Sequence, residues 1–184
     1  MPIQTPICDF GQKALPFELK STDNKIISLD NIKGENGTVI MFICNHCPYV
    51  KAVTKEIVED CNELKKIGIN SVAICSNDAV NYPDDSFDNM IKFSNDNHFN
   101  FPYLQDETQE IAKAYDAVCT PDFFGYNKDL GLQYRGRLRE LKNFVPVKDG
   151  ESDLLKAMKQ IANTGKGPQN QIPSAGCGIK WKYN

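Results

Sequence analysis

The sequence contains no long hydrophobic run and no concentration of positive charge. Its longest purely apolar stretch, residues 39–44, has six residues, whereas a membrane-spanning helix needs about 20. The 21 basic residues are balanced by 24 acidic ones, and no basic run is longer than Lys65-Lys66. This balance argues against partners such as nucleic acid or an anionic membrane. The first residues also lack the charged and then apolar pattern of a secretory signal, so we expect no export.

Histidine and tryptophan are scarce, but the chain of 184 residues has seven cysteines. A small secreted disulfide scaffold is usually shorter and has an even number of cysteines. We therefore expect a cytoplasmic protein with reduced, mostly buried thiols. Cys61 and Cys75 fall on apolar faces of expected elements and are predicted to be packing residues, whereas Cys8 has no assignable role.

One α/β domain is expected over residues 1–184, because no repeat or low-complexity segment interrupts the chain. Apolar periodicity predicts a mixed sheet with helices on both faces. The expected elements are an N-terminal β-hairpin (17–20 and 25–28), buried strands (38–43 and 71–75), helices (from 48, 86–95, 107–115 and 152–161) and a second hairpin (122–126 and 131–137). Residues 1–15 are expected to form an N-terminal arm, and the glycine- and proline-rich residues 165–184 an irregular tail.

A CxxC pair lies where the first buried strand ends and the long helix begins. A thiol at a helix N-terminus faces unpaired backbone N–H groups and the positive end of the helix dipole, which favour the thiolate. Cys44 and Cys47 are spaced to close a disulfide, and Pro48 is tolerated because a first-turn N–H has no intrahelical partner. A structural zinc site usually offers four ligands, and the other cysteines are isolated in sequence. The pair therefore indicates redox chemistry without a metal or another cofactor.

Three motifs, MFICNHCPYVKA, VCTPDFF and PSAGCGIKWK, resemble the thioredoxin-fold superfamily. More narrowly, they resemble its peroxiredoxin-like branch, the alkyl hydroperoxide reductase/thiol-specific antioxidant proteins, with a CxxC motif. The resemblance implies a thioredoxin-like fold for the whole domain. It also implies that Pro121 has a cis peptide bond opposite the cysteines and that Thr120 faces the sulfurs. Cys119, one residue earlier, should point away from them.

The resemblance leaves two assignments of the reactive thiol open. In a thioredoxin-like reading, Cys44 is an exposed nucleophile and Cys47 resolves the mixed disulfide. In a peroxiredoxin reading, Cys47 is the peroxidatic cysteine, which that family also follows with proline. The peroxidase pattern is incomplete, because Ile40 and Cys44 replace its proline and its threonine or serine, and no arginine precedes Arg135. These departures favour disulfide exchange.

The thioredoxin pattern is also incomplete. Thr38 stands where a buried carboxylate would assist proton transfer, and Ile43 replaces a tryptophan. His46 occupies the position before the second cysteine, as in more oxidising relatives such as protein disulfide isomerase. A partly charged imidazole there can stabilise the Cys44 thiolate and with it the reduced form. The alternative is that His46 is only an exposed loop residue.

Two further features of the second half carry expectations. Cys177 precedes a Trp-Lys pair by four residues, as a C-terminal resolving cysteine does in two-cysteine peroxiredoxins, so it is a candidate third redox thiol. It could equally be a spectator in a tail packed by Trp181. Arg135, Arg137 and Arg139 alternate along the second hairpin and are expected to share one face, which a solvated edge would explain as well as a binding site would.

The sequence therefore predicts a thiol–disulfide oxidoreductase that works through Cys44 and Cys47. The substrate would be a protein or small-molecule disulfide, and a thiol reductant system would regenerate the enzyme. A thiol peroxidase that uses Cys47 and a redox-responsive binding protein without turnover are the alternatives. The sequence leaves the oligomeric state open.

Overall fold

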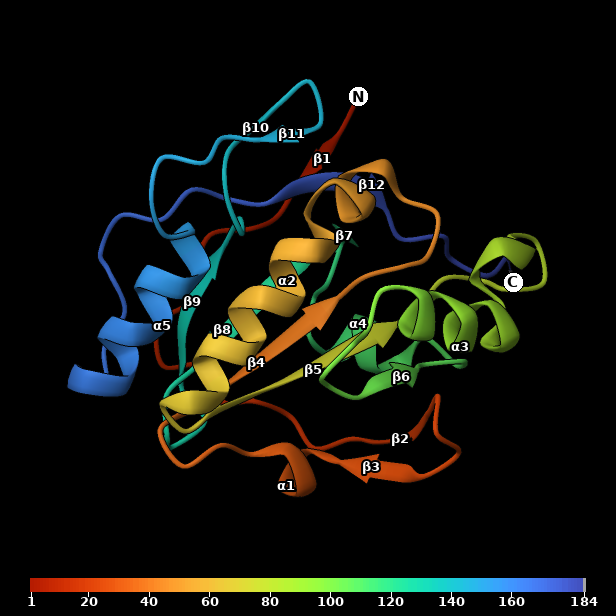
Figure 1. Cartoon of the computed structure of the whole chain (residues 1–184). Helices are drawn as coiled ribbons and strands as arrows, with labels where there is room; N and C mark the ends of the chain where they lie inside the picture. The colour runs from red at the N-terminus through yellow and green to blue at the C-terminus, as the bar shows by residue number, and fades with distance from the viewer. Residues whose placement is uncertain (184) are drawn as a thin grey trace.

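A computed structural model describes residues 1–183, and its centre is a seven-stranded mixed sheet (Figure 1). The strand order is β3-β2-β6-β5-β4-β8-β9. These strands are β2 (Glu18–Ser21), β3 (Ile26–Ser28), β4 (Gly37–Phe42), β5 (Ile69–Cys75), β6 (Tyr103–Gln105), β8 (Asp122–Tyr126) and β9 (Leu132–Gly136). The helices are α1 (Leu29–Ile32), α2 (Pro48–Lys66), the 3-10 turn η1 (Pro83–Asp85), α3 (Phe87–Asp96), α4 (Glu110–Ala114) and α5 (Asp153–Thr164). The mixed sheet and its flanking helices confirm the expected α/β, thioredoxin-like fold.

The central strands are buried because helices cover both faces of the sheet. Every residue of β4 is buried, and β4 pairs in parallel with β5 and antiparallel with β8. Strands buried on both faces have continuous apolar sequences, which explains the run at 38–43. Residues of α2, α3 and α5 pack on one face of the sheet, and residues of α1 and α4 pack on the other.

Helix α2 positions the cysteine pair. Val50, Val53, Ile57 and Leu64 form its buried apolar face, and Lys65 and Lys66 occupy its last turn, where positive charge complements the helix dipole. No helix of the described residues is long and apolar enough to cross a membrane.

The helix expected at 107–115 is shorter, Glu110–Ala114. The carboxylate of Asp106 accepts hydrogen bonds from the backbone N–H groups of Ile111 and Ala112 and is buried. Gln109 has a left-handed backbone (φ 66°), so the chain cannot enter the helix earlier.

The tail expected to be irregular contains strand β12 (Ala175–Gly178). It lies between β1 (Ile3–Gln4) and β7 (Cys119–Thr120) in a second, three-stranded sheet. Gly176 permits this pairing, because a Cβ atom there would lie 1.9 Å from the Thr120 carbonyl oxygen. The glycine that suggested irregular structure instead allows two backbones to approach closely. Asn184, the last residue of the predicted tail, lies outside the described residues. A short hairpin, β10 (Leu141–Lys142) with β11 (Val145–Pro146), completes the strands.

The expectation of a solvated arginine edge is wrong. Arg135 is buried and pairs with Asp122 at 2.9 Å, with its guanidinium over the ring of Phe124. Arg139 is also buried and pairs with Glu56 on α2 at 2.6 Å. Phe124 packs on the α4 side of the sheet, opposite α2. The side chains of Arg135 and Arg139 therefore lie on opposite faces of the sheet, because the alternation of side chains along the strand ends where β9 ends, at Gly136.

Candidate active site

Cys44 and Cys47 lie in the loop between β4 and α2, and Cys47 is the N-cap residue of the helix. Cys44 is 1% exposed and Cys47 is 0% exposed, so the expectation that Cys44 is exposed is wrong. The tail accounts for part of this cover, because β12 packs against α2 and brings Cys177 beside Cys47.

Thr120 contacts both sulfur atoms from the opposite side. The Thr120–Pro121 peptide bond is cis, as the resemblance implied. The Oγ1 atom of Thr120 lies 3.4 Å from Sγ of Cys44, and the Cys47 thiol donates to the Thr120 carbonyl oxygen at 3.3 Å. The neighbouring thiol of Cys119 instead contacts the carbonyl oxygen of Pro121. Thr120 therefore fixes the spacing of the pair through both its side chain and its backbone.

The surroundings of Cys47 favour its thiolate. A hydrogen bond from the Cys44 thiol is the largest influence, and the Cys177 thiol and the backbone N–H groups of Val50 and Cys177 add to it. Together they lower the pKa of Cys47 to about 5, against the opposing effect of burial. When Cys47 is ionised, its sulfur accepts these hydrogen bonds instead of donating to Thr120.

The surroundings of Cys44 favour its thiol. The pKa of Cys44 is raised by its hydrogen bond to Cys47, by burial and by the carboxylate of Asp85, while the Thr120 hydroxyl opposes these effects. The two sulfurs share a hydrogen bond, so only one of them can give up its proton easily. The unequal neighbours place the negative charge on Cys47 rather than on Cys44.

His46 lies next to a buried carboxylate. Its Nδ1 atom lies 2.6 Å from Oδ2 of Asp85, whose side chain is fully buried. Oδ1 of Asp85 also accepts the backbone N–H of Asn45 at 2.8 Å. The sequence analysis did not identify Asp85 as a site residue. Nothing in the sequence links Asp85 to a loop about 40 positions earlier.

Cys44, His46 and Asp85 are the only trio of potential metal ligands found close together among residues 1–183, with donor atoms within 4.8 Å of one another. Nδ1 of His46 and Oδ2 of Asp85 are in close polar contact at 2.6 Å, although Nδ1 has no hydrogen-bond partner of regular geometry. Oδ2 of Asp85 also already accepts a hydrogen bond from Asn77. Because this oxygen is already engaged, the trio fits a histidine–carboxylate pair beside a thiol better than an ion site.

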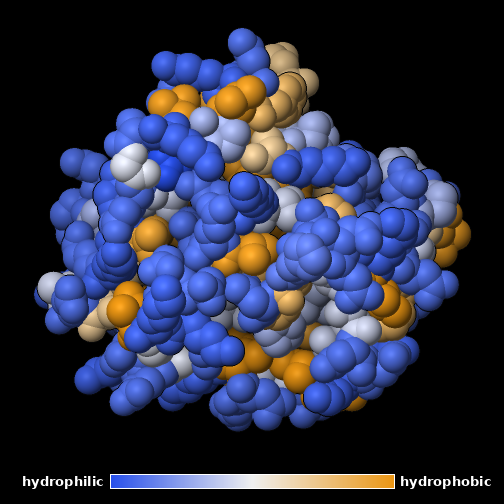
Figure 2. Space-filling model, viewed as in Figure 1, coloured by the Kyte–Doolittle hydropathy of each residue, from blue (hydrophilic) through white to orange (hydrophobic). Residues whose placement is uncertain are grey.

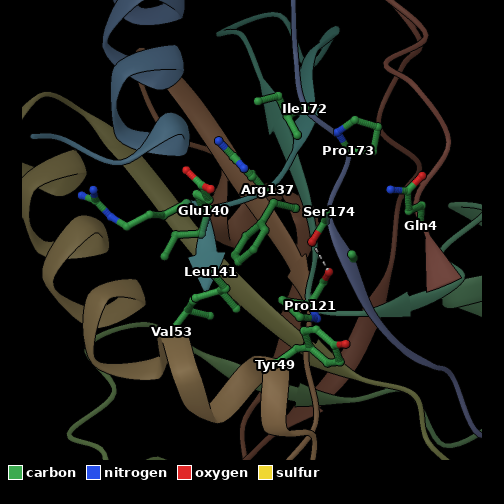
Figure 3. Close-up of a pocket in the computed structure, with 14 residues that line it drawn as sticks. Gln4, Tyr49, Val53, Pro121, Arg137, Glu140, Leu141, Ile172, Pro173 and Ser174 are labelled. Atoms are coloured by element: carbon green, nitrogen blue, oxygen red, sulfur yellow. Dashed lines mark hydrogen bonds between the residues drawn. The ribbon is translucent and has the colours of Figure 1, made fainter. Parts of the chain in front are cut away.

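A pocket of about 240 Å³ lies beside Pro121, the cis proline that follows Thr120 (Figure 3). Tyr49 and Pro121 line it, and Ser174 donates a hydrogen bond to the carbonyl oxygen of Pro121 at 2.7 Å. The ring of Phe144, on the β10–β11 hairpin, packs edge-on against the pocket residue Tyr49, with 4.9 Å between the ring centroids. Figure 2 shows a mostly hydrophilic face with apolar residues gathered near this hairpin, where Phe144 and Val145 are exposed.

The sulfur environment leads to a first prediction. Titration of the reduced protein, followed by thiolate ultraviolet absorbance, is expected to show one thiolate forming with a midpoint near the pKa of about 5 that Cys47 has. Cys177→Ala should raise this midpoint, because it removes a side-chain donor to Cys47. Cys61→Ala is the matched control, since Cys61 is buried on the far part of α2. A single midpoint near 8.5, the ordinary value for cysteine, would contradict the prediction.

Fold and site together define a thioredoxin-fold protein with a cysteine pair at a helix N-terminus. The sequence pattern of the AhpC/TSA family matches residues 10–140. The chain belongs to this family, and its function is thiol redox chemistry.

Solved structures share this fold. The chain is similar to an uncharacterized conserved protein from Geobacillus kaustophilus, with 43% identity, 100% of this chain and 98% of that chain covered and a TM-score of 0.93. It is also similar to a hypothetical protein from Sinorhizobium meliloti, with 30% identity, coverage of 98% and 99% and a TM-score of 0.90. A putative thiol:disulfide interchange protein DsbE from Chlorobium tepidum shares the fold at 17% identity, with 84% and 97% covered and a TM-score of 0.62. No curated protein gives a significant match.

Proposed function

We propose that the protein is a thiol–disulfide oxidoreductase that works through Cys44 and Cys47. The observation that carries this proposal is the placement of the two cysteines at the start of α2, where the Thr120 side chain contacts Sγ of Cys44 at 3.4 Å and the Thr120 carbonyl oxygen contacts Sγ of Cys47 at 3.3 Å. The Cys47 thiolate attacks a substrate disulfide and releases one substrate thiolate. Cys44 then loses its proton and attacks Sγ of Cys47, which releases the second thiolate and leaves a Cys44–Cys47 disulfide. A thiol reductant returns two electrons and two protons to the pair.

This order differs from the thioredoxin-like assignment made from the sequence, in which Cys44 attacks first. The helix begins at Pro48, directly after the second cysteine. Backbone N–H groups at the start of the helix therefore stabilise the thiolate of Cys47, whereas the carboxylate of Asp85 disfavours a negative charge on Cys44.

The second candidate is a thiol peroxidase in which peroxide oxidises Cys47 to a sulfenic acid. The lowered pKa of Cys47 at the helix start favours it. The arginines do not, because Arg135, Arg137 and Arg139 bind Asp122, Asp153 and Glu56, respectively. No guanidinium of the described chain is therefore free to polarise a peroxide at the sulfurs, and disulfide exchange is the better supported reaction.

Cys177 is proposed as a third redox thiol. It is half-buried, whereas Cys44 and Cys47 are fully buried, and its thiol and backbone N–H contact Cys47. Burial raises the pKa of the Cys177 thiol to about 11, so Cys177 must first lose its proton. Its thiolate then attacks Cys47 of the oxidised pair, forms a Cys47–Cys177 disulfide and releases Cys44, which takes up a proton. This exchange would carry the disulfide towards solvent.

The test compares reduction of a protein disulfide with consumption of hydrogen peroxide by the wild-type protein, each with a thiol reductant present. Faster disulfide reduction supports the proposal, faster peroxide consumption supports the peroxidase, and neither activity supports a binding protein. Mass spectrometry of the oxidised protein then shows which cysteines are paired and whether Cys177 takes part. The cytoplasmic location remains a prediction.

The reduction potential is expected to be less negative than that of thioredoxin, which is about −270 mV. A thiol whose pKa lies near 5 is largely ionised at neutral pH, and this stabilises the reduced form relative to the disulfide. Equilibration with glutathione at defined ratios, followed by thiol quantification, measures the potential. A value more negative than that of thioredoxin would refute the expectation.

A further inference from the structure

The carboxylate of Asp85 is buried beside the cysteine pair and comes from a part of the chain remote in sequence. It lies in η1 and has no exposed side-chain surface. Its oxygens accept hydrogen bonds from the Asn45 backbone and the Asn77 side chain, both at 2.8 Å, and Oδ2 faces Nδ1 of His46. Asn45 is itself held by the Tyr103 hydroxyl at 2.8 Å. A buried carboxylate with this many partners is fixed in position.

We propose that Asp85 and His46 form the base that accepts the Cys44 proton when Cys44 resolves the mixed disulfide on Cys47. The proposal rests on the proposed function, because it concerns the second step of that reaction. In this step the Cys44 S–H bond breaks and its proton passes to the Asp85–His46 pair. The Cys44–Cys47 bond forms, the bond from Cys47 to the substrate sulfur breaks, and the substrate leaves as a thiolate. No further oxidant or reductant is needed.

The step needs a base because only a thiolate attacks a disulfide. Cys44 is fully buried. In the reduced pair the Cys47 contact raises its pKa most, and burial and the Asp85 charge, which are still present in the mixed disulfide, raise it further. Sγ of Cys44, a ring nitrogen of His46 and a carboxylate oxygen of Asp85 lie within 4.8 Å of one another. Such separations in a resting site shorten to hydrogen bonds, or are bridged by one water, when the reacting complex forms.

The other ionisable groups around Asp85 do not compete for this role. Cys75 on β5 and Tyr103 on β6 both face the Asp85 charge, and both have raised pKa values because they are buried. They stay protonated near neutral pH and cannot accept a proton. On the tail, Lys180 lies over the ring of Tyr82 rather than beside the carboxylate.

His46 provides the route out for the proton. Its side chain is 28% exposed, whereas that of Asp85 is 0% exposed. A proton received by the pair can therefore pass from the imidazole to water without opening the core. The charged carboxylate of Asp85 thus lies in the interior, and the imidazole of His46, which exchanges protons with water, lies at the surface.

The test separates the two steps with a symmetrical aromatic disulfide, whose halves absorb visible light when released as thiolates. The first release reports attack by Cys47, and the second reports resolution by Cys44. Asp85→Asn keeps an oxygen for the Asn45 N–H but cannot accept the proton. It is expected to slow the second release at least about tenfold, as for loss of a general base, and to leave the first within about twofold. The remaining rate should rise steeply with pH, because Cys44 must then ionise directly into solvent.

His46→Gln should also slow the second release, and the double variant should be no slower than the slower single variant, because both residues act in one pair. Asp84→Asn is the control, since it removes an exposed acidic residue from the same turn. A purely electrostatic role for Asp85 predicts the opposite sign, because removing its charge lowers the pKa of Cys44 and speeds resolution. An unchanged or faster second release in Asp85→Asn would overturn the inference. Absence of a second release from the wild-type protein would instead overturn the proposed function.

Discussion

Cys47→Ser is expected to lower the rate of the first attack on a disulfide by about 1,000-fold or more, equivalent to about 4 kcal/mol of transition-state stabilisation. The variant loses the ionised sulfur at the start of α2, and the remaining Cys44 has a pKa raised by burial and Asp85. Cys44→Ser is expected to keep the first attack and to stop at a mixed disulfide on Cys47. Single-turnover reactions with mass spectrometry of the trapped adduct measure both outcomes.

The controls for this experiment come from the chain itself. Cys61→Ser removes a buried packing thiol from α2 without touching the pair, and it should react at the wild-type rate. Cys177→Ser in the Cys44→Ser background tests whether the adduct on Cys47 can be resolved by Cys177. If the adduct instead forms on Cys44 and survives Cys47→Ser, the thioredoxin-like order is correct and ours is wrong.

Arg135→Met is expected to lower the free energy of unfolding by about 3–5 kcal/mol, the usual cost of leaving a buried charge without its partner. The side chains of Arg135 and Asp122 are 5% and 0% exposed and lie 2.9 Å apart. Arg135 also donates to the carbonyl oxygen of Asp116 at 2.7 Å. Urea unfolding at neutral pH measures the change. A loss below about 1 kcal/mol, as for exposed ion pairs, would contradict the prediction.

The sign of the pH dependence follows from Asp122. Burial already raises its pKa in the folded state even with Arg135 present, and removing the guanidinium raises it further. A carboxyl group with a raised folded-state pKa binds its proton more tightly in the folded protein than in the unfolded one. The stability lost in Arg135→Met is therefore largest above that pKa. It should shrink as the pH falls through the folded-state pKa towards the unfolded value. Adding Asp122→Asn should recover part of the lost stability at neutral pH, because no unpaired charge remains.

Local pattern was sufficient to predict the centre of the fold. The apolar run at 38–43 and the three- and four-residue spacing after Pro48 are dictated by which faces are buried. The structure has β4, α2 and β5 at these places. The cysteine pair was also predicted to lie at a strand end and a helix start. The continuous apolar run of the strand ends at these residues, and the helical periodicity begins directly after them. The cis bond at Pro121 came from the family resemblance, which composition could not have supplied.

Features that depend on distant partners were not predictable in this way. Arg139 and Glu56 are 83 positions apart, and nothing near either residue indicates an ion pair. Asp85 reaches the site only because η1 follows β5, the parallel neighbour of β4. The burial of Cys44 depends on cover from distant segments, including a tail whose glycines and prolines resemble those of a loop. In each case the missing information is the tertiary position of a second segment.

Strand β12 has a consequence for biosynthesis. It joins residues near the two ends of the described chain, with Ile3 opposite Gly176 and Cys177 opposite Thr120. Pairings between residues so far apart in sequence form late, because a large loop must close first. A ribosome must therefore have made residues 175–178 before Cys47 can acquire its neighbour Cys177. The nascent chain contains Cys44 and Cys47 long before strand β12 is made. Cys47 therefore acquires its full thiolate stabilisation only after the chain has been completed and folded.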